Sequence, residues 1–366
     1  MPVKFWDSTK TSIKPTYPGY DNVTRINNHV EKQKAKAIDI LTKLQERNEL
    51  RYLSIQEVKE RISGKTKNQS FFSFTKKLIR SLAAENRLGT ARSYKNVLNQ
   101  VKKFQKDKDI SFNELNYQFL LRFEHSFMSR GFSENGLAVY MRTIRAIYNK
   151  AIKEGCAELE AYPFKKYSIK TKPTKKRAIE YVAIKKIANL NFEPTDPLYH
   201  TRNIFLMSFY LQGAPFMDLA FLKMNKLIDG SVQYKRKKTG RFYDIKITPS
   251  LQSILNYYLS SKNPNDFILP IIKRESLVDQ YNDVQWAHKR HNIRLKEIAK
   301  LAGIDENLTS YVSRHSFASI ANNLGVPVTA ISEMLGHEKL TTTQVYLSSL
   351  KKDVLDQYHE QVIGGG

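Results

Sequence analysis

The sequence predicts a mainly α-helical protein with one small β-hairpin. Apolar residues recur at helical spacing along most of the chain, whereas residues 231–247 alternate apolar and polar side chains around Thr239-Gly240. A basic, proline-containing stretch at 166–176 and a polar, basic loop at 64–70 divide the helical pattern into three regions. We therefore expect a helical bundle, a larger and mostly helical domain that carries the hairpin or a small sheet, and a small amino-terminal region.

The composition restricts the partner before any motif is considered. The 366 residues are enough for two or three domains, and 60 Lys and Arg against 35 Asp and Glu give a formal charge of +25. This excess of positive charge indicates a polyanionic partner, of which nucleic acid is the commonest. No apolar run approaches the roughly 20 residues that span a bilayer, so we expect no membrane partner. A single cysteine, Cys156, and the lack of metal-ligand spacing predict a reducing cytoplasm and no bound metal.

The first two regions are expected to be helical. Residues 1–68 contain one strong helix at about 23–47, and residues 69–165 contain helices at about 90–104 and 135–154. The last two helices carry basic residues off their apolar stripes, which we expect to contact DNA phosphates. These residues are Arg92, Lys95, Lys102, Arg142 and Arg145. The alternative is that they form the solvated faces of an ordinary bundle.

The third region, residues 177–363, contains the most distinctive run of the chain. Tyr311-Val-Ser-Arg314-His-Ser-Phe is followed by Leu335-Gly-His337, and Tyr346 stands nine positions after that histidine. This run resembles the C-terminal signature of the tyrosine recombinases, the phage integrase family, and is similar to integrases of bacterial integrative and conjugative elements. The resemblance implies a site-specific DNA recombinase that integrates or excises a mobile element through a 3′-phosphotyrosine intermediate.

The resemblance also gives each residue of the run a role. Tyr346 is the expected nucleophile, and Arg314 is expected to bind two non-bridging phosphate oxygens, which suits a planar guanidinium. His337 is expected to hydrogen-bond the scissile phosphate. Tyr311 stands where the family usually has a histidine, and its hydroxyl can still donate a hydrogen bond.

The family carries its general acid, a lysine, in a hairpin turn, and Lys238 stands at such a turn. It is expected to protonate the 5′ oxygen that leaves the phosphate. Counting by twos places it on the same strand face as Val232 and Tyr234. Three neighbours compete for the role: Arg236, Lys237 and Arg241.

One family residue is missing from this chain. Pro215 occupies the place of the first family arginine, and Gln212 stands where some relatives place an arginine just before the glycine. Arg202 lies ten residues upstream of Gln212, about 15 Å along a helix axis, and is a poor substitute. Asp218 matches the family's acidic residue, which orients and does not react.

The resemblance implies a domain arrangement and partners. It predicts an arm-binding-like region at 1–68, a core-binding, SAM-like helical domain at 69–165, a basic linker at 166–176 and a catalytic domain at 177–363. The implied partner is double-stranded DNA at attachment sites, bound by a homo-tetramer, with accessory directionality or DNA-bending proteins possible. The apolar stripe of the C-terminal helix either links protomers or packs on its own domain. Because each transesterification conserves the phosphodiester energy, no cofactor is expected. A bacterial, cytoplasmic and nucleoid-associated location follows.

Three other functions remain open on the sequence alone. The proline at 215 allows a catalytically impaired relative that only binds DNA. Residues 319–336 could form a helix-turn-helix, which would suit a regulator without strand cleavage. A DNA relaxing enzyme of the type IB kind would share the phosphotyrosine chemistry.

Overall fold

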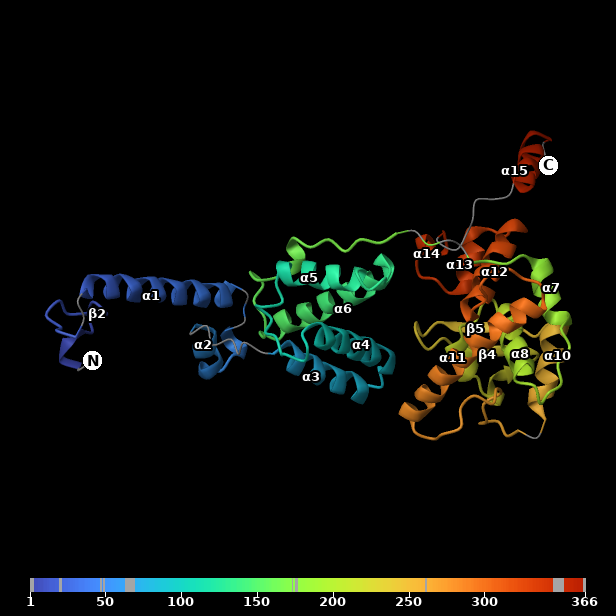
Figure 1. Cartoon of the computed structure of the whole chain (residues 1–366), viewed down its shortest axis with the longest axis horizontal. Coiled ribbons are helices and arrows are strands. Elements are labelled where there is room, and N and C mark those ends of the chain that lie inside the picture. Colours follow the sequence, from blue (N-terminus) through green and yellow to red (C-terminus); the bar gives the residue numbers. More distant parts are fainter. Residues whose placement is uncertain are drawn as a thin grey trace. The chain divides into compact units, whose positions relative to one another are not determined.

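The computed structural model describes residues 3–19, 22–46, 48, 50–62, 70–172, 174, 177–260, 262–344 and 352–364. The chain divides into two compact units, 1–172 and 173–366 (Figure 1). The fold is mainly helical with a small antiparallel sheet, so the predicted fold class is confirmed. No helix of the described residues is long and apolar enough to cross a membrane.

The amino-terminal part of the first unit is a short ribbon tied to a long helix. Strands β1 (Trp6–Asp7) and β2 (Ser12–Ile13) pair antiparallel, and helix α1 spans Val23–Glu46. The Asn27 side chain holds the ribbon to α1, because it accepts a hydrogen bond from the Ile13 amide (2.7 Å) and donates one to the Ile13 carbonyl (2.9 Å). The short helix α2 (Ile55–Ile62) follows.

The rest of the first unit is a helical bundle. Its helices are α3 (Phe71–Ala84), α4 (Leu88–Phe104), α5 (Tyr117–Met128) and α6 (Glu134–Lys153). Three of them begin at capping side chains that accept a backbone hydrogen bond: Ser70, Asn116 and Ser133. The predicted stripe of α4 is buried as expected, and Phe104 at its end packs edge-on against Phe119, with 5.4 Å between ring centroids. The bundle therefore has an aromatic-rich core of its own.

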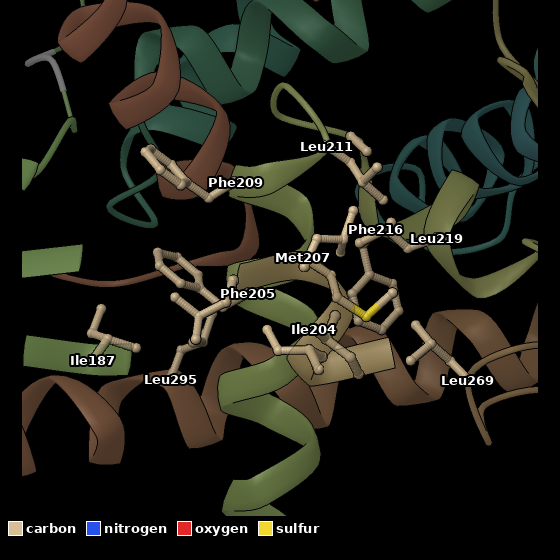
Figure 2. Packing of buried hydrophobic residues seen from close by; sticks show 14 of the residues in the cluster. Ile187, Ile204, Phe205, Met207, Phe209, Leu211, Phe216, Leu219, Leu269 and Leu295 are labelled. Atoms are coloured by element: carbon tan, nitrogen blue, oxygen red, sulfur yellow. The ribbon is translucent and has the colours of Figure 1, made fainter. Parts of the chain in front are cut away.

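The second unit is built around helix α8 (Pro197–Tyr210), which is buried on nearly every side. Helices α7 (Tyr181–Asn189), α10 (Pro249–Leu259), α11 (Leu277–Leu301) and α12 (Ser310–Asn323) pack against it. Figure 2 shows this core, in which Phe205 and Met207 of α8 meet Ile187 of α7, Leu295 of α11 and Phe216 of α9 (Phe216–Ala220). The helices that hold the site are thus positioned by one shared core.

The sheet of the second unit contains the predicted hairpin. Strands β3 (Leu227–Ile228), β4 (Ser231–Lys235) and β5 (Phe242–Lys246) lie in that order, and the tyrosine pair Tyr234 and Tyr243 stacks across β4 and β5 at 5.2 Å. The ladder ends at the pair of Lys235 and Phe242. Counting by twos as far as Lys238 is therefore wrong, because residues 237–239 form a turn in which strand alternation no longer holds.

Three short helices complete the second unit. Helix α13 (Val328–Leu335) follows α12 after a turn at Gly325, and α14 (Leu340–Gln344) follows α13. Helix α15 spans Lys352–Gly364 and leaves Leu355 and Val362 exposed. The predicted nucleophile Tyr346 lies outside the described residues.

Candidate functional site

The site is centred on Arg314 in helix α12. Its side chain is buried (2% exposed), and Nη1 donates a hydrogen bond of 2.9 Å to the carbonyl of Gly213 in the turn after α8. Nη2 donates to the carbonyl of Leu335, the last residue of α13, and lies 3.0 Å from Nε2 of His337. Three segments that are distant in the sequence therefore meet at one guanidinium.

A glycine is required where the turn after α8 meets α12. Gly213 has a φ of +74°, and a Cβ placed on it would lie 2.9 Å from the Cα of Arg314. A side chain at this position would be strained by the backbone conformation and would also press against the backbone of α12. The absence of a Cβ is what allows Arg314 to reach the Gly213 carbonyl.

His337 lies directly after α13 and is connected to α14. Gly336 reverses the chain with a φ of +64°, and Nδ1 of His337 lies 2.9 Å from Oγ1 of Thr343. An arginine can only donate, so Nε2 of His337 is the acceptor and Nδ1 carries the proton that Thr343 accepts. Burial, together with the charges of Arg314 and Arg236, lowers the pKa of His337 to about 4. The imidazole is thus neutral at physiological pH.

Arg236 places a second guanidinium in the site. Its backbone closes the hairpin, since its amide donates to the carbonyl of Arg241 (2.8 Å). Its side chain is 11% exposed, and Nη1 lies 3.2 Å from the Leu335 carbonyl and 3.4 Å from the Gly336 carbonyl. Nε is buried without a hydrogen bond and lies 3.7 Å from Oδ2 of Asp218. Arg236 and Arg314 therefore donate to the same carbonyl oxygen.

Asp218 of α9 is the carboxylate of the site. Its side chain is 4% exposed, and Oδ1 accepts a hydrogen bond of 3.0 Å from the Lys237 amide. Burial raises the pKa of this carboxyl, while the Lys237 amide and the charge of Arg236 oppose the rise. Asp218 thus holds both the start of the hairpin turn and the Arg236 side chain.

The turn directs its two lysines differently. Both residues are exposed, but the ammonium of Lys237 lies over the ring of Phe221, 3.0 Å from its centroid. Burial of that ammonium lowers the pKa of Lys237, and the charge of Asp218 opposes the effect. Lys237 is therefore tied to Asp218 through its amide and to Phe221 through its ammonium.

Tyr311 and Arg314 line one cavity of about 340 Å³. The Tyr311 ring packs edge-on against His315 at 5.0 Å, and its side chain is 49% exposed. Pro215 lines the same cavity, so the place expected for the first arginine does face the site but carries no charge. His288 hydrogen-bonds Ser310 (2.6 Å) and so anchors the first turn of α12.

Arg202 is engaged elsewhere. Its guanidinium donates to the Leu190 carbonyl and to Oδ1 of Asn203 (3.0 and 2.9 Å), and it lies over the rings of Phe192 and Tyr199. Leu190 and Phe192 precede α8, and Tyr199 and Asn203 lie in its first half, whereas Gly213 follows its C-terminal end. Arg202 therefore does not replace the missing arginine.

The basic residues predicted for the bundle are mostly on its surface. Arg92 and Lys95 of α4 and Arg142 and Arg145 of α6 are exposed. Ser93 and Thr143, the residues after Arg92 and Arg142, approach each other to 3.5 Å, so these two arginines flank the contact between the helices. Lys102 is half-buried, with its ammonium 5.6 Å from the Phe72 ring centroid. Four of the five residues are thus exposed.

Sequence reasoning missed the residues that define the site's shape. Arg236, Gly213 and Thr343 all contact Arg314, its acceptor carbonyl or His337, and none belongs to the signature run. The sequence presents Arg236 only as a competitor for the general acid. The alternation of side chains along the hairpin could have indicated the direction of Arg236. Using it requires knowing the residue at which the strand pairing ends, which is Lys235.

Comparisons with known proteins agree with this architecture. Residues 70–169 match the phage integrase SAM-like domain, and residues 180–353 match the phage integrase family. Among solved structures, a lambda integrase tetramer bound to a Holliday junction matches with a TM-score of 0.53 and 14% identity, covering 76% of this chain and 78% of that one. The Tn1549 transposon integrase in complex with a circular intermediate DNA gives 0.52 and 13% identity, covering 80% and 99%. At these identities the likeness shows the fold.

Sequence relatives match over shorter segments. The tyrosine recombinase XerD of Listeria monocytogenes is 41% identical over 68 residues, 18% of this chain and 23% of that protein. XerD of Pseudomonas putida is 33% identical over 103 residues, 28% of this chain and 31% of that protein. The chain thus spans less than a third of the length of these relatives. With both integrase domains matched in order and the expected fold present, the chain belongs to the phage integrase family of tyrosine recombinases.

Proposed function

We propose that this chain is a site-specific DNA recombinase that integrates or excises a mobile element. The observation that carries the proposal is the chain of contacts from Arg314 through His337 to Thr343. Thr343 is three residues before Tyr346, and three residues of chain span at most about 11 Å. In this proposal the buried guanidinium of Arg314, the neutral imidazole of His337 and the hydroxyl of Tyr346 act on one phosphate.

The reaction is two successive transesterifications. The Tyr346 hydroxyl attacks the scissile phosphorus, the bond to the 5′ oxygen breaks, and a 3′-phosphotyrosine forms. The freed 5′ hydroxyl of another strand then attacks this phosphorus and displaces the tyrosine. Arg314 binds the non-bridging oxygens, where negative charge increases in the transition state. Tyr311, which lines the same cavity as Arg314, adds a hydrogen bond to the phosphate.

His337 can serve as a hydrogen-bond donor to the phosphate through a change of tautomer. In the structure Nε2 faces Arg314 and Nδ1 faces the Thr343 hydroxyl. A threonine hydroxyl both donates and accepts, so it can donate to Nδ1 when Nε2 carries the proton. Thr343 is therefore a positioning residue for His337.

Lys238 is the proposed general acid for the 5′ oxygen. Its side chain is exposed at the tip of the hairpin, where it can approach a bound strand. Lys237, in contrast, is held over the Phe221 ring. The two neighbours thus provide a matched pair for testing the assignment.

The bundle supplies a grip on the duplex. Arg92, Lys95, Arg142 and Arg145 are exposed cations on two adjacent helices, and the net charge of +25 favours a polyanion. Lys102 joins them if its ammonium leaves the Phe72 ring. We assign core binding to 69–165, a linker to 166–176, catalysis to 177–363 and accessory, arm-like binding to 1–68.

The active form is proposed to be a tetramer on two duplexes of attachment-site DNA. Helix α15 exposes Leu355, Tyr358 and Val362, an apolar surface that a neighbouring protomer can cover. Proteins that direct or bend the DNA would act on this assembly. The place of action is the bacterial cytoplasm, at the nucleoid. A helix-turn-helix regulator is not favoured, because α12 buries Arg314 within the site.

Covalent trapping tests the proposal. A suicide substrate carries the element's end and a nick that lets the short 5′-hydroxyl fragment leave, so rejoining is prevented. The wild type should give a protein–DNA adduct on a denaturing gel, and Tyr346→Phe should bind the same DNA equally but give none. A wild type that binds this DNA tightly without an adduct would show a protein that only binds.

A further inference from the structure

Without the first family arginine, the site lacks one positive charge that would face the phosphate. Pro215 has no charge and begins α9, and Arg202 is bound at the far half of α8. Arg314 alone would then face the developing charge on the phosphate. A single guanidinium can bind two oxygens, whereas a phosphorane-like transition state presents more negative charge than the ground state.

Arg236 lies where it can stabilise this negative charge together with Arg314. Its Nη1 and the Nη2 of Arg314 both donate to the carbonyl oxygen of Leu335. Two guanidinium groups that share one acceptor lie side by side. Arg314 comes from helix α12, within the signature run, whereas Arg236 comes from the hairpin, outside that run. The His337 pKa is lowered by both arginines, which agrees with their common proximity to the imidazole.

The donors of Arg236 are incompletely used. Nε is buried without a hydrogen bond, and within the described part of the chain Nη2 donates none. Asp218, 3.7 Å from Nε, holds the side chain in place without a hydrogen bond. Buried polar groups without a hydrogen bond are rare, and a ligand is one explanation for the unused donors of Arg236.

The charges also match a phosphate. Arg236, Arg314 and Asp218 together carry a net charge of one positive, and neutral His337 adds none. A phosphodiester carries one negative charge, so the positive charge of the site favours its binding. The same charge stabilises the transition state more strongly, because the transition state is more negative than the phosphodiester. Arg241, also on the hairpin, is instead paired with Glu333 at 3.5 Å, so it is not available in the same way.

We infer that Arg236 is a catalytic residue that binds the scissile phosphate beside Arg314, in the role for which the family uses an arginine at the place of Pro215. The hairpin thereby supplies both a phosphate-binding arginine and the proposed general acid. This inference rests on the proposed recombinase function.

The test compares two substrates. One suicide substrate carries the normal phosphodiester, and the other carries a methylphosphonate at the scissile position, which removes the negative charge that a guanidinium would stabilise. Arg236→Ala should slow adduct formation by about 100-fold or more on the phosphodiester. On the methylphosphonate the loss should be about tenfold or less. Arg241→Ala, the matched control on the same hairpin, should leave both rates near those of the wild type.

The outcomes separate this inference from the proposed function. Equal rates for Arg236→Ala and wild type, or an equal loss on both substrates, would overturn the role of Arg236. If Arg236→Ala does not fold, Arg236→Lys serves, because it keeps the charge and loses the fork. A lysine variant as active as wild type on the phosphodiester would also overturn a role that depends on two donors. No adduct from the wild type on either substrate would instead refute the recombinase function.

Discussion

Replacing Gly213 by alanine should disable the site more than it destabilises the fold. The backbone φ of +74° costs an alanine about 1–2 kcal/mol. The new Cβ would also lie 2.7 Å from Cγ and 2.9 Å from Cα of Arg314, so α12 or the turn must move by about 0.5–0.7 Å to reach ordinary contact at 3.4 Å. Such overpacking costs about 1–3 kcal/mol more. We expect the free energy of unfolding to fall by about 2–5 kcal/mol in total.

The displacement falls on the guanidinium itself. Moving the turn from α12 lengthens the 2.9 Å hydrogen bond between Arg314 Nη1 and the Gly213 carbonyl, so the fork loses its orientation. A misplacement of about 1 Å can cost about 100-fold in rate, and we expect adduct formation to fall by about 10- to 100-fold. DNA affinity should change little, because the exposed cations of the bundle are untouched.

Gly230→Ala is the matched control. Gly230 has nearly the same φ, +73°, but a Cβ on it would meet nothing within 4 Å. It therefore imposes the backbone strain without the collision. Urea unfolding gives the loss of stability in each variant, and adduct rates are measured at urea concentrations well below both unfolding midpoints. The difference between the two variants is the contribution of the contact with Arg314. Equal losses of stability and of rate in the two variants would refute the reasoning.

Three further predictions follow from single side chains. Lys238→Ala should slow adduct formation on a normal substrate but not on one with a 5′-bridging sulfur, because a thiolate leaves without protonation. Lys237→Ala is the control. If the sulfur substrate restores the rate of Lys237→Ala and not that of Lys238→Ala, Lys237 is the acid. Burial lowers the pKa of His291 to about 3, so the contribution of the neutral, buried imidazole to stability is fully present above pH 6.5. As pH falls from 6.5 toward 3, unfolding should become easier by up to about 1.4 kcal/mol per pH unit, and His291→Leu should flatten this slope in urea titrations. Arg92→Ala with Arg142→Ala should weaken DNA binding at all sequences and reduce the salt slope by about two, and an unchanged slope would remove these residues from the interface.

Local patterns in the sequence were sufficient for the helices and the hairpin. The stripe on α4 predicts both the helix and its buried side, because helical periodicity and burial depend on neighbouring residues alone. The hairpin around Gly240 was predicted for the same reason. The signature run likewise identified Arg314 and His337, which the structure joins at 3.0 Å.

The parts that were not predicted depend on contacts between distant segments. The direction of Arg236 is set by the end of the strand ladder at Lys235 and by Asp218, 18 residues earlier in the sequence. Strand alternation cannot be extended into the turn at residues 237–239, which is why counting by twos does not apply to Lys238. The need for glycine at 213 arises from α12, about a hundred residues away. Neither feature has a local pattern from which it could be read.

The way in which the site holds its cations explains how it can remain positively charged before DNA arrives. Arg314 and Arg236 are bound mainly by the carbonyls of Gly213, Leu335 and Gly336, which follow or end helices α8 and α13. Carbonyl oxygens carry partial negative charge, which the C-terminus of α13 increases at Leu335, so they orient a guanidinium without cancelling its charge. Carboxylates in those places would neutralise it, and the phosphate would then have to displace them. With Asp218 as the one carboxylate near Arg236 in the described residues, the excess charge remains available to the substrate. Replacing the hairpin's Arg236 therefore removes charge that no other contact of the site restores.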